Sequence, residues 1–193
     1  GLLAAVLFHL PGRFVLSGLA AALGGVFHAN FLLLAPPMFL LAHVVVRPPA
    51  WRRTWLTQIA PCVLVLLVRL PELLALGRDS HAAEGRLIFM SIRSPHHYLP
   101  LTFLPDFAFF YGWQLLGLIG CWRLSERTEP LDRLRALLVS VFALVTAATL
   151  LTTVVFVPAV AQLYVFRLAP FGVLLAQLAF CARALTIGRR LRA

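Results

Sequence analysis

The sequence contains no lysine and few acidic residues, so its positive charge is carried by arginine. Charged residues make up only 12% of the 193 residues, with 17 basic and 7 acidic side chains. Hydrophobic residues make up 61%, whereas a soluble domain is usually nearer half apolar. The mean hydropathy is +0.91. One water-soluble core cannot hide this excess, so the composition predicts an integral membrane protein in contact with a lipid bilayer.

Several chemical signatures are also missing. Cys62, Cys121 and Cys181 lie in apolar runs without the Cys-x-x-Cys or Cys/His spacing of zinc sites, and they read as small buried side chains. The sequence has no phosphate-binding glycine loop, no nucleophile elbow and no His-Glu-x-x-His motif. The arginines that give the net charge of +10 lie between apolar runs, and no soluble basic domain is visible. We therefore expect no cofactor and no nucleic-acid partner.

The apolar runs predict an all-α, polytopic transmembrane helical bundle with about six crossings and a partial N-terminal helix. The chain opens without Met or a basic leader region, so we expect a fragment of a larger protein that forms a single transmembrane domain over residues 1–193. Prolines at 36, 37 and 61 predict kinks, and residues 77–105 form the one long polar region, an outer loop. The partial helix is expected at 2–10 and the crossings at 14–27, 31–46, 54–68, 106–123, 137–157 and 168–184.

Arginine spacing predicts the orientation. The dense groups lie at 47–53, 123–135 and 183–192, and strict alternation of crossings places all of them on one side. Segments rich in arginine stay on the cytoplasmic side of a membrane. We therefore expect a bacterial inner (cytoplasmic) membrane protein with a cytoplasmic C-terminus. Acidic residues near the second group are expected to balance its arginines.

The densest polar motif lies on the opposite, outer side. It contains two adjacent histidines and a tyrosine between two prolines, which hold the backbone extended: His96, His97 and Tyr98. Neutral imidazoles bind substrate or carry protons near neutral pH, so this motif is a candidate substrate site. The alternative is a solvated loop. Metal binding by Asp79, His81, Glu84 and this histidine pair is a weaker alternative, because the spacing matches no known site.

Three further residues are predicted on the outer side, each with two interpretations. Arg167 pairs with a lipid phosphate or reaches toward headgroups. Asp106 caps the following helix or faces a pocket. His28 caps a helix end or lines the same pocket. By contrast, His9 and His43 lie within apolar runs and are expected to pack or to form interhelical hydrogen bonds.

Three segments together resemble bacterial membrane glycosyltransferases of the GT-C type. The segment 18–28 is similar to helices of that family, and 162–167 to a late helix carrying Gln and Arg. The Arg-x-Pro-His-His-Tyr element at 93–98 looks like an outer loop of bacterial membrane proteins with the same architecture. The resemblance implies sugar transfer from a polyprenyl-phosphate lipid at the periplasmic face. It implies that His96 and His97 contact substrate and that Arg167 holds the donor phosphate. Arg93 and Tyr98 of the same loop are further candidate substrate contacts.

The chain departs from that family in one respect. The family's catalytic acid lies in a first outer loop, and residues 1–46 contain no acidic residue. No general base is therefore assigned. A non-catalytic integral membrane protein is the main alternative. A transporter or flippase is a weaker one, because the charges lie at the ends of apolar runs and not within them.

Sidedness is directly testable. Single cysteines placed at positions 96 and 127, in a background without native cysteines, should react differently with a membrane-impermeant thiol reagent added to intact cells. We expect position 96 to react and position 127 to react only after the cells are lysed. Labelling of 127 but not 96 would reverse the assigned orientation.

Overall fold

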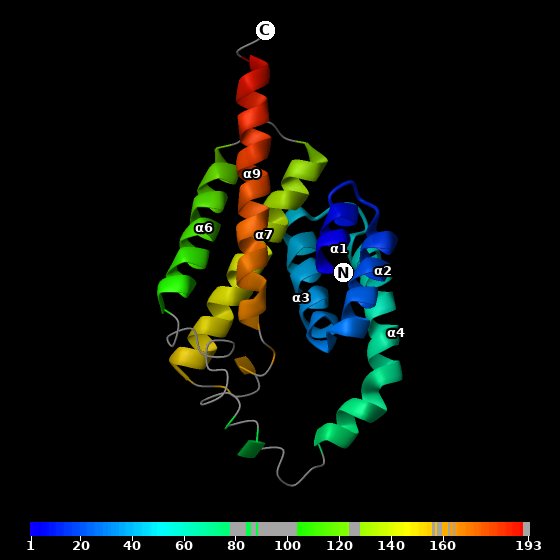
Figure 1. The fold of residues 1–193 in the computed structure, drawn as a ribbon. Helices are drawn as coiled ribbons and strands as arrows, with labels where there is room; N and C mark the ends of the chain where they lie inside the picture. The colour runs from blue at the N-terminus through cyan, green and yellow to red at the C-terminus, as the bar shows by residue number, and fades with distance from the viewer. Residues whose placement is uncertain are drawn as a thin grey trace.

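The computed structural model describes residues 1–77, 84–85, 88, 104–123, 128–155, 157, 160–161, 163 and 165–190. Regular structure in this part of the chain is entirely helical (Figure 1). In chain order the elements are α1 (Leu2–His9), α2 (Phe14–Phe27), α3 (Ala29–Val46), α4 (Trp51–Gly77), α6 (Leu104–Trp122), α7 (Glu129–Thr153), the short 3-10 helix η4 (Val165–Leu168) and α9 (Ala169–Arg190).

The helices form two groups that meet chiefly where α3 packs on α7. Helices α1 to α4 pack against one another, and α6, α7 and α9 form the second group. Helix α3 packs on α7 and thereby joins them (Figure 1). The buried core follows these contacts, with Phe39 and Met38 of α3 and Leu137 and Leu138 of α7 at 0–1% exposure.

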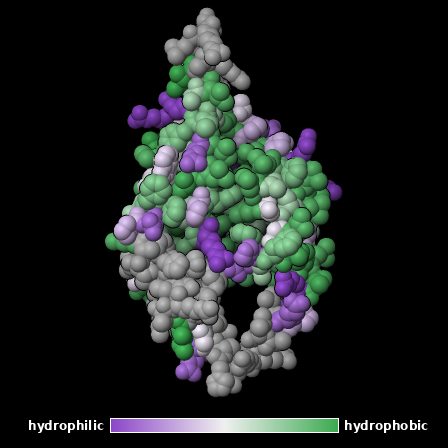
Figure 2. Space-filling view, in the orientation of Figure 1, coloured by the Kyte–Doolittle hydropathy of each residue, from purple (hydrophilic) through white to green (hydrophobic). Residues whose placement is uncertain are grey.

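Four helical segments are long and apolar enough to cross a membrane: Ala29–Val46, Trp51–Glu72, Glu129–Thr153 and Val165–Leu185. Large apolar side chains also cover the outside, which is largely green in Figure 2. Leu64 is 64% exposed and Val68 79% exposed on α4. Exposed apolar surface of this extent is suited to lipid. The described residues therefore form a helical bundle of the membrane type, and six crossings stay a prediction.

Helix α2 has the predicted bounds, whereas several later boundaries differ from the prediction, most of all the start of α7 and the ends of α4 and α9. Helix α7 begins at Glu129 and not at 137, so part of the expected charged loop is helical. Pro130 near its start and Glu129 and Asp132 in its first turn suit a helix N-terminus, where the peptide dipoles favour negative charge. Helix α9 continues to Arg190, so the expected basic tail from 187 is helical over most of its length.

Prolines do not end the helices that contain them. Helix α3 continues through Pro36 and Pro37, and α4 continues through Pro61 and Pro71, nine residues beyond the predicted end at Val68. Prolines are tolerated in membrane helices because neighbouring groups satisfy the freed backbone atoms. The indole Nε1 of Trp55 on α4 donates a hydrogen bond to the Pro36 carbonyl at 3.1 Å, which ties the two helices together at this point.

Glycines set the closest helix contacts. A Cβ at Gly18 on α2 would lie 1.9 Å from the backbone oxygen of Gln58 on α4. A Cβ at Gly117 on α6 would lie 2.4 Å from the Ala176 side chain on α9. Membrane helices associate largely through such close approach, because lipid gives no hydrophobic drive between them.

Gly18→Ala should therefore destabilise the bundle. The added methyl meets backbone, which cannot rotate away, so we expect a loss of about 2 kcal/mol in the free energy of unfolding. The matched control is Gly112→Ala on α6, where nothing lies within 4 Å of the added carbon. That variant should be neutral or slightly stabilised through helix propensity. Unfolding in mixed detergent micelles measures both. Equal stability of the two variants would contradict the close-packing account.

Candidate functional site

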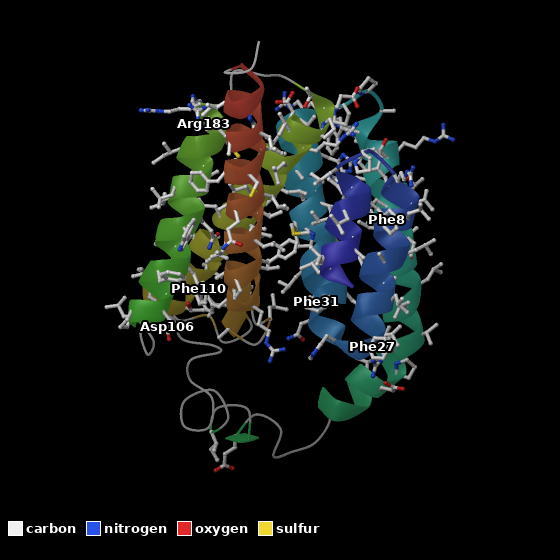
Figure 3. All side chains as sticks on the ribbon, turned by 45° about the horizontal axis from the view of Figure 1, so that its top comes forward. Phe8, Phe27, Phe31, Asp106, Phe110 and Arg183 are labelled. Atoms are coloured by element: carbon white, nitrogen blue, oxygen red, sulfur yellow. The ribbon has the colours of Figure 1, made fainter. Side chains whose placement is uncertain are left out.

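Three of the predicted outer-side residues lie at the same end of the bundle. His28 lies between α2 and α3, Asp106 lies in the first turn of α6, and Arg167 lies in η4 just before α9. Figure 3 shows Asp106 and Phe27 toward this end and Arg183 at the opposite one. Because successive helices run in opposite directions, residues distant in sequence share this end, and the described arginines of the dense groups share the other. We call them the arginine-poor and the arginine-rich end.

Each of the three side chains is exposed to solvent or lipid. His28 is the residue before α3, its side chain makes no capping hydrogen bond, and its ring contacts Phe31 with 5.8 Å between centroids. Helix α6 begins at Leu104, so the expectation that Asp106 caps it was wrong and the carboxylate lies inside the first turn. Nearby, Arg69 donates to the Val26 carbonyl at 2.8 Å and pairs with Glu72 at 3.1 Å.

The loop motif lies outside the described residues, and with it Arg93, His96, His97 and Tyr98. Most of the weaker metal set, Asp79, His81 and the histidine pair, also lies outside. Among the residues that the structure describes, no group of three or more His, Cys, Asp or Glu side chains is placed to hold a metal ion.

A buried polar cluster near the arginine-rich end connects all four helices of the first group. Its centre is the side-chain amide of Gln58 on α4, which is fully buried. Nε2 of this amide lies 3.0 Å from Nδ1 of His9 on α1 and 2.8 Å from Oγ of Ser17 on α2. Oε1 lies 2.8 Å from Nε2 of His43 on α3. The histidines are each 2% exposed and Ser17 is fully buried.

The donor and the acceptor of each hydrogen bond in this cluster can be assigned. The Ser17 hydroxyl donates to the Ala5 carbonyl at 2.7 Å, so its oxygen accepts from Gln58. The second amide hydrogen of Gln58 then goes to Nδ1 of His9, and the amide oxygen accepts from His43. Nδ1 of His9 therefore carries no proton, which makes His9 the neutral Nε2–H tautomer, and His43 carries a proton on Nε2. The Gln58 amide therefore uses both hydrogens and its oxygen within the cluster.

Aromatic rings and one arginine enclose the cluster. The His9 ring stacks on Phe39 at 5.1 Å and meets Phe14 edge-on at 5.2 Å. The guanidinium of Arg133 on α7 lies 5.4 Å from the Phe14 ring centroid and donates to the Leu10 carbonyl at 2.9 Å. A cation over an aromatic face and at a helix C-terminus is stabilised by both. Arg133 thus ties the second helix group to the turn after α1.

A second buried amide lies between α6 and α9. Nε2 of Gln114 donates to the Phe110 carbonyl at 3.2 Å and reaches the Ala169 carbonyl at 3.5 Å. Its Oε1 is buried without a hydrogen-bond partner among the described residues. Gly172 makes room for it, since a Cβ there would lie 2.5 Å from the amide carbon.

Comparison with known proteins adds no relative. No protein-family model matches the chain, and no curated protein or solved structure is similar to it. The likeness to GT-C glycosyltransferases stays a prediction from the sequence, and any function must be argued from the residues themselves.

The interhelical hydrogen bonds expected for His9 and His43 are confirmed. Gln58 and Ser17, which complete the cluster, were not singled out from the sequence. A signal was present, because each is a polar residue within an apolar run, and such residues in membrane helices usually bond to a neighbouring helix. The balance expected between acidic residues and arginines is also confirmed by the Asp132–Arg135 and Glu129–Arg133 pairs.

Gln58→Leu tests the cluster. The substitution keeps the size of the side chain but leaves His9, Ser17 and His43 without their shared partner, so we expect a loss of about 2–3 kcal/mol in the free energy of unfolding. Gln177→Leu on α9 is the matched control, because Gln177 is exposed and apolar replacement there should change stability by less than about 0.5 kcal/mol. Unfolding in detergent measures both, and a Gln58→Leu protein as stable as the control would refute the role of the amide.

Proposed function

We propose that this chain is a polytopic helical membrane domain that binds the phosphate of a lipid-linked substrate at its arginine-poor end. The reaction we propose is the one that the sequence resemblance implies, transfer of a sugar from a polyprenyl-phosphate donor at the periplasmic face. In this proposal the arginine-rich end faces the cytoplasm of a bacterial inner membrane. The supporting observation is that the order of the helices places His28, Asp106 and Arg167 at this same end of the bundle.

The chemistry of these residue types suits a lipid phosphate. A guanidinium at a membrane surface binds phosphate oxygens in a charge-assisted, often bidentate arrangement. Arg167 lies in the short turn of helix that leads into α9, where it is exposed. In the proposal it holds the donor phosphate, while His96 and His97 orient the acceptor or carry a proton. The residue that removes the proton from the acceptor is not assigned.

A second candidate, a non-catalytic membrane scaffold, is favoured by the cluster around Gln58. The Gln58 amide bonds to side chains of three other helices, which is the arrangement expected of a structural element that fixes helix positions. The same observation argues against transport through this cluster, because a transport path needs ionisable groups that face water or substrate.

Lipid binding distinguishes the two candidates. The chain is reconstituted in phosphatidylcholine nanodiscs and titrated with a polyprenyl phosphate, and binding is followed by the change in melting temperature. Arg167→Gln should weaken binding about tenfold, equal to about 1.4 kcal/mol, because one charged phosphate contact is lost. Arg167→Lys should keep part of the affinity.

The matched control is Arg53→Gln, an exposed arginine at the arginine-rich end. It should bind the lipid phosphate as the wild type does. Wild-type affinity in Arg167→Gln, or equal losses in both variants, would refute the phosphate site. His96→Ala/His97→Ala should bind the lipid yet abolish function in cells at normal protein level, and full function of that variant would favour the scaffold.

A further inference from the structure

A cavity at the arginine-rich end lies outside the proposed substrate site. It has a volume of about 370 Å³, within the range of small-molecule pockets. Three helices line it: Val45 and Val46 at the end of α3, Leu118, Cys121 and Trp122 at the end of α6, and Asp132, Arg135 and Val139 of α7. Helix α7 forms its floor, since α3 and α6 both pack on α7.

The walls combine an apolar interior with a charged edge. The valines, Leu118 and the largely exposed indole of Trp122 supply apolar surface. Arg135 supplies the charge and is held in place, since its Nε donates to the Cys121 carbonyl at 2.9 Å and its Nη1 to Asp132 at 2.7 Å. Its side chain is only 16% exposed. A guanidinium fixed by two hydrogen bonds keeps its position when a ligand arrives.

Two more arginines directly follow residues of the lining in the chain. Arg47 follows Val46 directly and Arg123 follows Trp122 directly, so each adjoins a lining residue in the chain. Both are exposed. Arg183 of α9 donates to the Arg123 carbonyl and adds a fourth guanidinium to this end. The cavity lining itself contains a single carboxylate, that of Asp132. Because Asp132 pairs with Arg135, the excess positive charge at this end comes from Arg47, Arg123 and Arg183.

We propose that this cavity binds an anionic phospholipid of the surrounding bilayer. Its phosphate lies among Arg135, Arg47 and Arg123, and the upper part of its acyl chains lies against Val45, Leu118 and Trp122. Basic pockets between helices at the arginine-rich face of a membrane protein suit anionic headgroups, and the apolar walls suit a lipid better than a free ion. In this position the lipid contacts both α3 and α6, which each pack on α7.

Native mass spectrometry and thermal unfolding of the full chain test this site, with phosphatidylglycerol, phosphatidylcholine or inorganic phosphate added to the detergent-solubilised protein. We expect phosphatidylglycerol to be retained and to raise the melting temperature, and phosphatidylcholine to bind at least tenfold more weakly. Equal effects of the two lipids would overturn the proposal. Inorganic phosphate that stabilises as much as phosphatidylglycerol would also overturn it, because the site would then hold an ion and not a lipid.

Two variants locate the lipid. Val45→Trp fills the cavity from a half-exposed position without changing charge, and Val63→Trp on α4 is its control outside the cavity. Arg135→Gln removes the central charge, with Arg53→Gln as its control. We expect Val45→Trp and Arg135→Gln each to weaken phosphatidylglycerol binding about tenfold, and both controls to bind as the wild type does. Because Arg135 also supports local structure, Val45→Trp decides the matter, and unchanged phosphatidylglycerol binding in a folded Val45→Trp protein refutes the site.

Discussion

The hydrogen bonds of the Gln58 amide are the interaction on which the first helix group depends. A polar side chain within an apolar bundle must find partners, since no water is present to satisfy it. Gln58 finds them on three other helices, through His9, Ser17 and His43. Satisfying one amide therefore fixes the rotation and height of α1, α2 and α3 relative to α4. The contact of Gly18 with the backbone of Gln58 brings α2 close enough for this geometry.

The arginine distribution gives the bundle two chemically different ends. At the arginine-rich end the guanidiniums also act structurally, because Arg133, Arg135 and Arg183 each donate to a backbone carbonyl near a helix end. Such bonds satisfy carbonyls that a helix terminus leaves without a partner and oppose the helix dipole. In the proposed lipid site, Arg135 also contacts the phosphate of the bound lipid. The arginine-poor end has fewer cations, so a single one such as Arg167 is more distinctive there.

The positions of the helices were largely predictable from the sequence. Helix ends that contain charged residues were not. Phe14–Phe27 was predicted with the correct bounds because apolar runs and turn residues define it locally. The start of α7 was predicted eight residues too late, because Asp132, Arg133 and Arg135 read as a solvated loop. On the helix Asp132 pairs with Arg135 three residues on, and Glu129 pairs with Arg133 four residues on.

The sequence by itself determined the class of the protein, because hydropathy is read from consecutive residues. It also determined which segments share an end, because each apolar run marks a helix and the chain turns back between successive runs. It also marked His9 and His43 as residues that bond between helices. Only the tertiary structure decided that Gln58 and Ser17 are their partners and that Val45, Leu118 and Arg135 surround one cavity. These contacts depend on how each helix is rotated about its axis. That rotation is set by close packing between segments far apart in the chain, and no local pattern records it.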